Sequence, residues 1–422
     1  MYRIWYSTES LADFIIDNTD LSNYKIIKNR LYESDISKPN DFHKTPDHIR
    51  KILYLDACDL IVEKDNEPVF SIEISTEAGT GHNAFQRFAR IAASVENNVP
   101  ALYVYPEAII IKRNSENSVR WDEINPLIFR AMEAVMNIYQ IPALLYYFPS
   151  DFRSYRNNPM DSPNYLRKGL NYDKKITKYA GCPDSGAHSI NKLFGVINEI
   201  IDCTEKEGVH EARKKLIGKV VIREQRNFMQ NEFSNKSKGR SEDEMSPLTA
   251  VNKVPTEYLL NYLSRYENKQ YKIGELLRSR SFTLIYQINA KFRGDPYAGA
   301  LTAIDYLKCR EGKTFEDRKY NLVLLFGVIS VDDNNHTIVV SDKNDSTIED
   351  LFSTVKNCDK CNLLTKDYTK LKNKDIPRYF MQLRYGSMFS KAKHIRVFSY
   401  FADAILFPDG SLWRDAWWAK NK

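Results

Sequence analysis

The clearest pattern of apolar and polar positions early in the chain is a pair of short apolar runs separated by a polar turn. The runs cover residues 59–64 and 69–75, and the turn covers 65–67. Strand-length apolar runs on either side of such a turn are typical of a β-hairpin. Residues 51–55 form a further apolar run of strand length just before the hairpin. The sequence therefore predicts that a β-sheet begins in this segment.

A helix and further strands are predicted directly after the hairpin. The apolar positions of 84–95 recur at helical spacing, and 101–105 is an apolar run that ends before Pro106. Helical spacing returns at 126–139, and 142–148 again has the length and composition of a strand. The predicted order of strand, strand, helix and strand describes an α/β domain.

A polar and charged stretch at 228–247, without an apolar period, has the composition of an exposed linker. We therefore predict a first domain over residues 1–230, a linker or mobile loop over 231–247, and a second domain over 248–422. The second domain is predicted to be mixed α/β, with helices near 256–266 and 298–308 and strands at 320–329, 336–340 and 395–401.

Composition supports a folded, two-domain protein. The 422 residues are longer than one core usually grows, and 43% hydrophobic with 12% aromatic residues predict packed globular structure. A net charge of +6 permits a polyanionic partner without requiring one. No basic segment followed by an apolar stretch begins the chain, and no run of about 18 apolar residues occurs, so neither a signal peptide nor a membrane span is expected. A cytoplasmic location is the resulting expectation.

Cysteine usage changes this picture little. Six cysteines are too sparse for a disulfide framework and suit a reducing compartment. Cys358 and Cys361 form one CxxC, but a zinc ribbon needs a second pair of ligands at a recognisable spacing. A turn that carries two thiols is the favoured interpretation, and zinc binding stays open.

Two carboxylates of the predicted hairpin are the main candidates for chemistry. Asp59 begins one strand and Glu73 lies within its neighbour, so both side chains can converge on one face of the sheet. Hydrolysis of a phosphodiester needs a metal that activates water, and Mg²⁺ prefers carboxylate oxygens together with water. The open alternative is that Glu73 lies on a solvated face of an edge strand, with Ile72 and Ile74 packed beneath it.

On Asp59, Glu73, the helix at 84–95 and the strand at 101–105, the segment resembles the PD-(D/E)XK nuclease superfamily. The resemblance covers a short part of the chain. It implies a restriction-endonuclease-like mixed sheet flanked by helices, within the α/β class. It also implies Mg²⁺ bound by Asp59, Glu73 and the main-chain carbonyl of Ile74, with cleavage that leaves a 5′-phosphate.

One position departs from the superfamily pattern. The lysine expected two residues after Glu73 is Ser75 here, which puts the identity of the general base in doubt. Variants of the superfamily carry the polar group on the following helix, from which Gln86 or Arg87 can reach the site. Glu77 is a candidate for binding a second metal or orienting water. The predicted catalytic residues are thus Asp59, Glu73, Ser75 and Gln86, and the predicted metal ligands are Asp59, Glu73, Ile74 and Glu77.

Basic residues interleaved with aromatic ones are candidates for holding DNA, because they can contact phosphates and stack on bases. Such segments occur at 152–156, 165–168 and 376–401, and an ordinary solvated loop is the alternative for the first two. The predicted DNA contacts are Arg87, Arg153, Arg156, Arg167, Lys168, Lys391, Lys393 and Arg396.

The resemblance and the two-domain layout point to a type II restriction endonuclease that cleaves double-stranded DNA. A homodimer would cut both strands by symmetry. Two alternatives remain open: a repair or transposition nuclease of the same superfamily, and a non-catalytic DNA-binding or defence protein on a degenerate nuclease fold, which Ser75 favours. A small-molecule enzyme is a third, against which stands the lack of a Gly-rich cofactor loop, a nucleophile elbow or a histidine cluster.

Overall fold

The computed structural model describes the chain as two compact units, which divide between Gly239 and Arg240. The described residues are 1–31, 45–53, 57–75, 82–112, 119–148, 151–161, 185–239, 250–265, 277–278, 280–287, 303–304, 307, 319–325, 327–341, 403–406 and 412–413.

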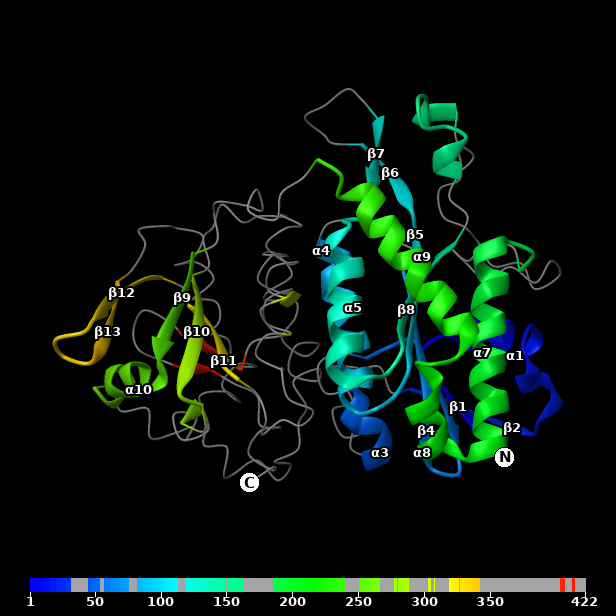
Figure 1. Cartoon of the computed structure of the whole chain (residues 1–422), viewed down its shortest axis with the longest axis horizontal. Helices are drawn as coiled ribbons and strands as arrows, with labels where there is room; N and C mark the ends of the chain where they lie inside the picture. The colour runs from blue at the N-terminus through cyan, green and yellow to red at the C-terminus, as the bar shows by residue number, and fades with distance from the viewer. Residues whose placement is uncertain are drawn as a thin grey trace. The chain divides into compact units, whose positions relative to one another are not determined.

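A six-stranded mixed sheet forms the centre of the first unit (Figure 1), in the order β2-β1-β3-β4-β5-β8. Its strands are β1 (Tyr2–Tyr6), β2 (Ile26–Arg30), β3 (Leu60–Lys64), β4 (Glu67–Ile74), β5 (Ala101–Pro106) and β8 (Ala143–Phe148). β1 is parallel to β2 and antiparallel to β3, β3 is antiparallel to β4, and β4, β5 and β8 are mutually parallel. The expectation of an α/β fold built on a mixed sheet is confirmed.

The hairpin between β3 and β4 closes through a two-residue turn at Asp65 and Asn66, whose φ values are 53° and 65°. Two consecutive positive φ values match the twist of the flanking strands, and Asp and Asn tolerate this conformation better than most residues. The predicted hairpin is confirmed. The strand predicted at 51–55 is wrong where the chain is described, because Lys51–Leu53 form a short 3-10 turn that buries Ile52 and Leu53.

Helices cover both faces of the sheet. α4 (His82–Glu96) and α5 (Leu127–Tyr139) lie along one face, and α7 (His188–Glu207) and α8 (Val209–Leu216) lie along the other. α9 (Val220–Lys236) packs on β8 and on α5. Because both faces are covered, β4, β5 and β8 are almost entirely buried, which explains their continuous apolar runs.

Shorter elements complete the first unit. The remaining ones are α1 (Glu9–Asp17), α3 (Asp47–Arg50), the 3-10 turns Asp20–Asn23, Asp151–Arg153 and Pro159–Asp161, and the antiparallel pair β6 (Ala108–Lys112) and β7 (Val119–Glu123). The predicted helix at 126–139 and strand at 142–148 are confirmed as α5 and β8. Within the described residues, no helix is both long and apolar enough to cross a lipid bilayer.

The linker predicted at 231–247 does not begin at 231, because α9 continues to Lys236 and the first unit extends to Gly239. Polar residues of this last stretch are paired within the unit. Lys236 Nζ lies 3.2 Å from Glu107 Oε1, and Glu232 Oε2 accepts a hydrogen bond from Tyr147. The stretch lacks an apolar period because its inward contacts are polar.

The second unit contains a five-stranded sheet in the order β15-β14-β11-β10-β9, a separate hairpin β12–β13, and the helix α10. The bounds are β9 (Ala250–Pro255), α10 (Thr256–Ser264), β10 (Phe282–Gln287), β11 (Asn321–Leu325), β12 (Val328–Asp332), β13 (Thr337–Ser341), β14 (Ala404–Leu406) and β15 (Leu412–Trp413). Buried residues of α10 and these strands form its core. This unit is a mixture of helix and strands, as predicted.

One prediction in the second unit is wrong, and two others lie wholly or mostly outside the described residues. The single strand predicted at 320–329 is two strands of different sheets, β11 and β12, because the apolar run continues across the bend that separates them. The predicted strand at 395–401 and most of the predicted helix at 298–308 lie outside the described residues.

Candidate active site

Asp59 and Glu73 lie at the same end of the hairpin. Asp59 stands directly before β3, and its main-chain N–H donates to the carbonyl of Ile72 at 3.1 Å. Its carboxylate accepts hydrogen bonds from Ser7 Oγ at 3.1 Å and from the main-chain N–H of Ile74 at 2.9 Å. These contacts tie the Asp59 side chain to the segment of β4 that carries Glu73.

One arginine faces both carboxylates. Arg90 Nη1 lies 2.7 Å from Glu73 Oε1 and 4.0 Å from Asp59 Oδ1. Arg87, one helical turn earlier on α4, donates to the same Glu73 oxygen at 2.6 Å and approaches the carbonyl of Ile74 at 3.5 Å. The site is therefore a pair of carboxylates bound to a pair of guanidinium groups.

Glu73 lies in the interior and not on a solvated face. It is 1% exposed, and β4 is a central strand flanked by β3 and β5. The alternative of a solvated edge strand is thereby wrong. Burial raises the pKa of Glu73 to about 8, since removal from water outweighs the opposing charges of Arg90 and Arg87, and Asp59 adds to the rise.

Two buried polar atoms of this site have no hydrogen-bond partner: Glu73 Oε2 and the hydroxyl of Tyr103. Tyr103 lies opposite Glu73 on the neighbouring strand β5, and burial raises the pKa of its hydroxyl well above the usual range. An unpaired buried carboxylate oxygen is costly and invites a ligand. Glu73 thus bonds both arginines through Oε1, whereas Oε2 has no hydrogen-bond partner.

The oxygen atoms present fit a magnesium ion. Mg²⁺ is usually held by one or two carboxylates together with water, and Asp59, Glu73 and the carbonyl of Ile74 supply such donors. The free Oε2 of Glu73 is the observation that carries this fit. No group of three or more His, Cys, Asp or Glu suited to a metal is found in the described part of the chain.

Ser75, at the position where the resemblance expects lysine, is fully buried, and its main-chain N–H donates to the carbonyl of Val104. Because residue 75 is a serine, this position supplies no charged amine to the site. Arg87, the predicted DNA contact on α4, is bound to Glu73, as described above. The signal that could have revealed this pairing is the spacing of Arg87 and Arg90, which places both on one side of a helix.

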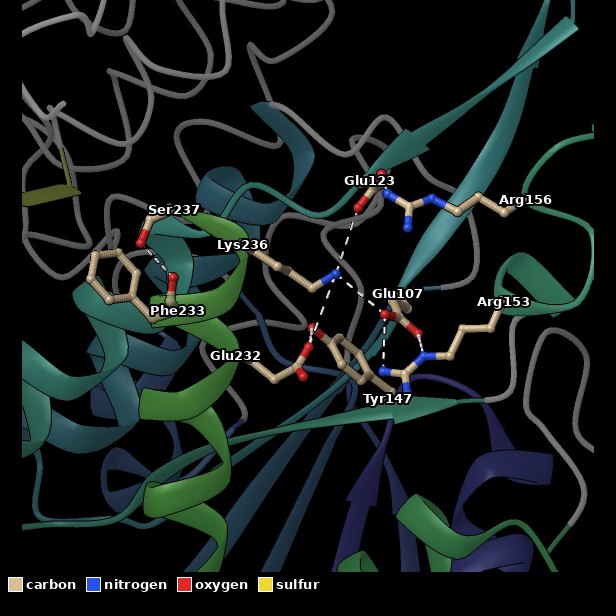
Figure 2. Close-up of polar contacts among 9 residues, drawn as sticks. All are labelled: Glu107, Glu123, Tyr147, Arg153, Arg156, Glu232, Phe233, Lys236 and Ser237. Carbon is tan, nitrogen blue, oxygen red and sulfur yellow. Dashed lines mark hydrogen bonds and ion pairs between the residues drawn. The ribbon is translucent and has the colours of Figure 1, made fainter. Parts of the chain in front are cut away.

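Arg153 and Arg156 lie in a different place, beside Glu107 and Glu123 (Figure 2). Arg153 makes two hydrogen bonds to Glu107, with Nε at 2.9 Å and Nη2 at 3.1 Å, which raise the pKa of its guanidinium. Arg156 is 4.0 Å from Glu123 Oε1 and 5.5 Å from the centre of the Phe152 ring. Their side chains are 67% and 70% exposed, so both remain accessible to a partner.

Several predicted residues lie outside the described residues. They are Glu77, Arg167, Lys168, Lys391, Lys393, Arg396, Cys358 and Cys361, together with the side chain of Gln86.

Sequence reasoning missed Glu107 and Lys236 as a charged pair. A carboxylate directly after a buried strand was the available signal for Glu107, and Lys236 was hidden in a stretch interpreted as linker.

Comparison of the chain with known families, with curated proteins and with solved structures finds no match.

Proposed function

We propose that this chain is a magnesium-dependent endonuclease that hydrolyses double-stranded DNA, acting as a type II restriction enzyme. The observation that carries the proposal is the convergence of Asp59 and Glu73 at one end of a hairpin, with Glu73 buried and its Oε2 unpaired. The arrangement of β3, β4, α4 and β5 supports it, because this is the order in which the superfamily presents its two acidic residues.

Each residue of the site has a role in this proposal. Asp59, Glu73 and the carbonyl of Ile74 would hold the metal, which lowers the pKa of bound water and polarises the phosphate. Ser7 and the N–H of Ile74 orient the Asp59 carboxylate. Arg87 and Arg90 fix Glu73 through Oε1 and supply positive charge where negative charge develops on the phosphate.

The raised pKa of Glu73 bears on metal binding. A carboxyl that is protonated near neutral pH must release its proton before it can bind a cation. The two arginines favour that release, since each opposes the effect of burial on Glu73. We therefore propose that activity increases as the pH approaches 8.

A non-catalytic DNA-binding protein on the same fold is the second candidate. It is favoured by Ser75 in place of the expected lysine and by the two guanidinium groups that already offset the charge of Glu73. Under this proposal, the acidic pair serves as a structural anchor for α4. A dimer of identical chains is compatible with either candidate.

The test is cleavage of a mixed-sequence plasmid with Mg²⁺ by the wild-type protein and by Asp59→Asn and Glu73→Gln, which preserve side-chain shape. The matched control is Glu63→Gln, since Glu63 is equally buried but lies at the turn end of the hairpin, where it bonds Arg3 and Trp5 of β1. Thermal melting verifies that all variants fold. We expect both site variants to lose more than about 100-fold in rate, beyond what residues surrounding a metal site usually cost, and Glu63→Gln to keep cutting.

Discrete fragments that disappear in both site variants would support the restriction enzyme, and cutting without discrete fragments would support a structure-dependent nuclease. Salt-sensitive DNA binding without any cutting would support the second candidate. Absence of both cutting and binding would overturn both.

A further inference from the structure

A cavity of about 280 Å³ lies in the first unit at the carboxyl ends of β5 and β8, away from the Asp59–Glu73 hairpin. Its walls come from the end of β8, the first turns of α7, and the middle of α9, with Arg153 at one side. This volume is just below the range of about 300–1,000 Å³ that is usual for small-molecule sites. Carboxyl ends of parallel strands are also where α/β sheets most often bind ligands.

One wall of the cavity attracts anions. The 20-residue helix α7 begins there after Ala187, whose side chain cannot cap it, and its first turn contains no acidic residue. The free N–H groups and the dipole of such a helix end favour negative charge. Lys192 and Arg153 line the same cavity and add two cationic side chains.

The acidic residue of the cavity does not cancel this charge. Glu107 is 8% exposed and is bonded by Arg153 at 2.9 and 3.1 Å and by Lys236 at 3.2 Å (Figure 2). Lys236 also lies 3.7 Å from Glu123 Oε2 and 4.0 Å from Glu232 Oε2. Arg156 lies 4.0 Å from Glu123 Oε1, so three cations match three carboxylates in this cluster. Arg153 is held in place by its contact with Glu107 while most of its side chain stays accessible.

The opposite wall is aromatic and carries a buried amide. The rings of Tyr147 and Phe228 meet edge to face with centroids 5.8 Å apart, and Lys192 Nζ lies 5.8 Å from the centre of Phe228. Gln225 is 3% exposed and donates through Nε2 to the carbonyl of Leu145, whereas no described residue donates to its amide oxygen. This oxygen lies at the wall of the cavity and can accept a hydrogen bond from an N–H group of a ligand.

We propose that this cavity binds a nucleoside 5′-phosphate, either as a free nucleotide or as the terminal nucleotide of a DNA strand. The phosphate lies at the start of α7 with Lys192 and Arg153, the base stacks on Phe228, and an N–H of the base donates to Gln225. The inference rests on the cavity alone and holds whether or not the hairpin carboxylates cleave DNA.

The test is calorimetric titration of the full chain with each of the four deoxynucleoside 5′-monophosphates, the matching unphosphorylated nucleosides, and inorganic phosphate. Ser189→Glu places a carboxylate in the first turn of α7, where it suits the helix but repels a phosphate. Phe228→Leu keeps the apolar volume and removes the ring. Ser234→Glu makes the same charge change on the exposed face of α9 and is the matched control.

We expect at least one monophosphate to bind more tightly than its nucleoside and than inorganic phosphate. Ser189→Glu should weaken binding at least about tenfold, given the strength of charge–dipole and charge–charge effects in partly buried geometries, and Phe228→Leu by about 5- to 100-fold, the loss of one base–aromatic stack. Ser234→Glu and Asp59→Asn should bind as the wild type does.

A second titration compares short DNA strands that carry or lack a 5′-phosphate. Preference for phosphorylated strands over free nucleotides supports a DNA end as the source, and the reverse preference supports a free nucleotide. Inorganic phosphate that binds as tightly as every nucleotide would overturn the proposal, as would binding that Ser189→Glu leaves unchanged or the absence of binding by every probe.

Discussion

The protonation of Glu73 gives a prediction that can be worked out from the structure. The carboxyl is fully enclosed by the sheet and α4, and burial raises its pKa from 4.5 to about 8 despite the two nearby arginines. In the unfolded chain the same carboxyl is solvated and releases its proton near pH 4.5. Between these two pH values the folded state therefore holds one proton more than the unfolded state.

This difference fixes the sign and the size of the effect. Because the folded state binds the extra proton, its stabilisation is complete below pH 4.5 and is lost progressively as the pH rises to about 8. At about 1.4 kcal/mol per pH unit, the full window corresponds to about 5 kcal/mol in the free energy of unfolding. Glu73→Gln keeps the shape of the side chain and cannot titrate, so it isolates this contribution.

Urea unfolding of the wild type and of Glu73→Gln, measured from about pH 5 to about pH 9, is the assay. We expect the wild type to lose stability relative to the variant as the pH rises, and the difference to level off above about pH 8. Stability curves that stay parallel across this range would refute the reasoning. That result would mean that Glu73 is ionised throughout and that Arg87 and Arg90 outweigh the cost of burial.

Two further predictions concern stability in the first unit. Glu63→Ala should destabilise the protein by about 3–5 kcal/mol, because it leaves the Arg3 guanidinium and the Trp5 indole N–H without their buried acceptor, and thermal melting against Glu63→Gln measures the loss. Asn66→Val should cost about 1–2 kcal/mol, since a β-branched residue is strained at a φ of 65°, and an equal denaturation midpoint for Asn66→Val and the wild type would contradict this account.

Much of the local structure could be predicted from the sequence, because it depends on neighbours along the chain. The alternation of strand and turn residues at 59–75 was enough to predict the hairpin, and the helical spacing of apolar residues was enough to predict α4 and α5. The pairing of Asp59 with Glu73 also follows from the hairpin alone. These features have periods of two or of 3.6 residues, which a sequence displays directly.

Tertiary structure decided which charges meet. Glu73 is buried because β5 and α4 cover it, and Arg153 bonds Glu107, 46 residues away in the sequence, because the chain returns past the end of β5. The stretch at 231–236 is helical for the same kind of reason, since its polar side chains pair with Glu107 and Tyr147. Sequence patterns carry no direct record of such contacts, because a long-range ion pair depends on how whole elements pack and leaves no periodic signal along the chain.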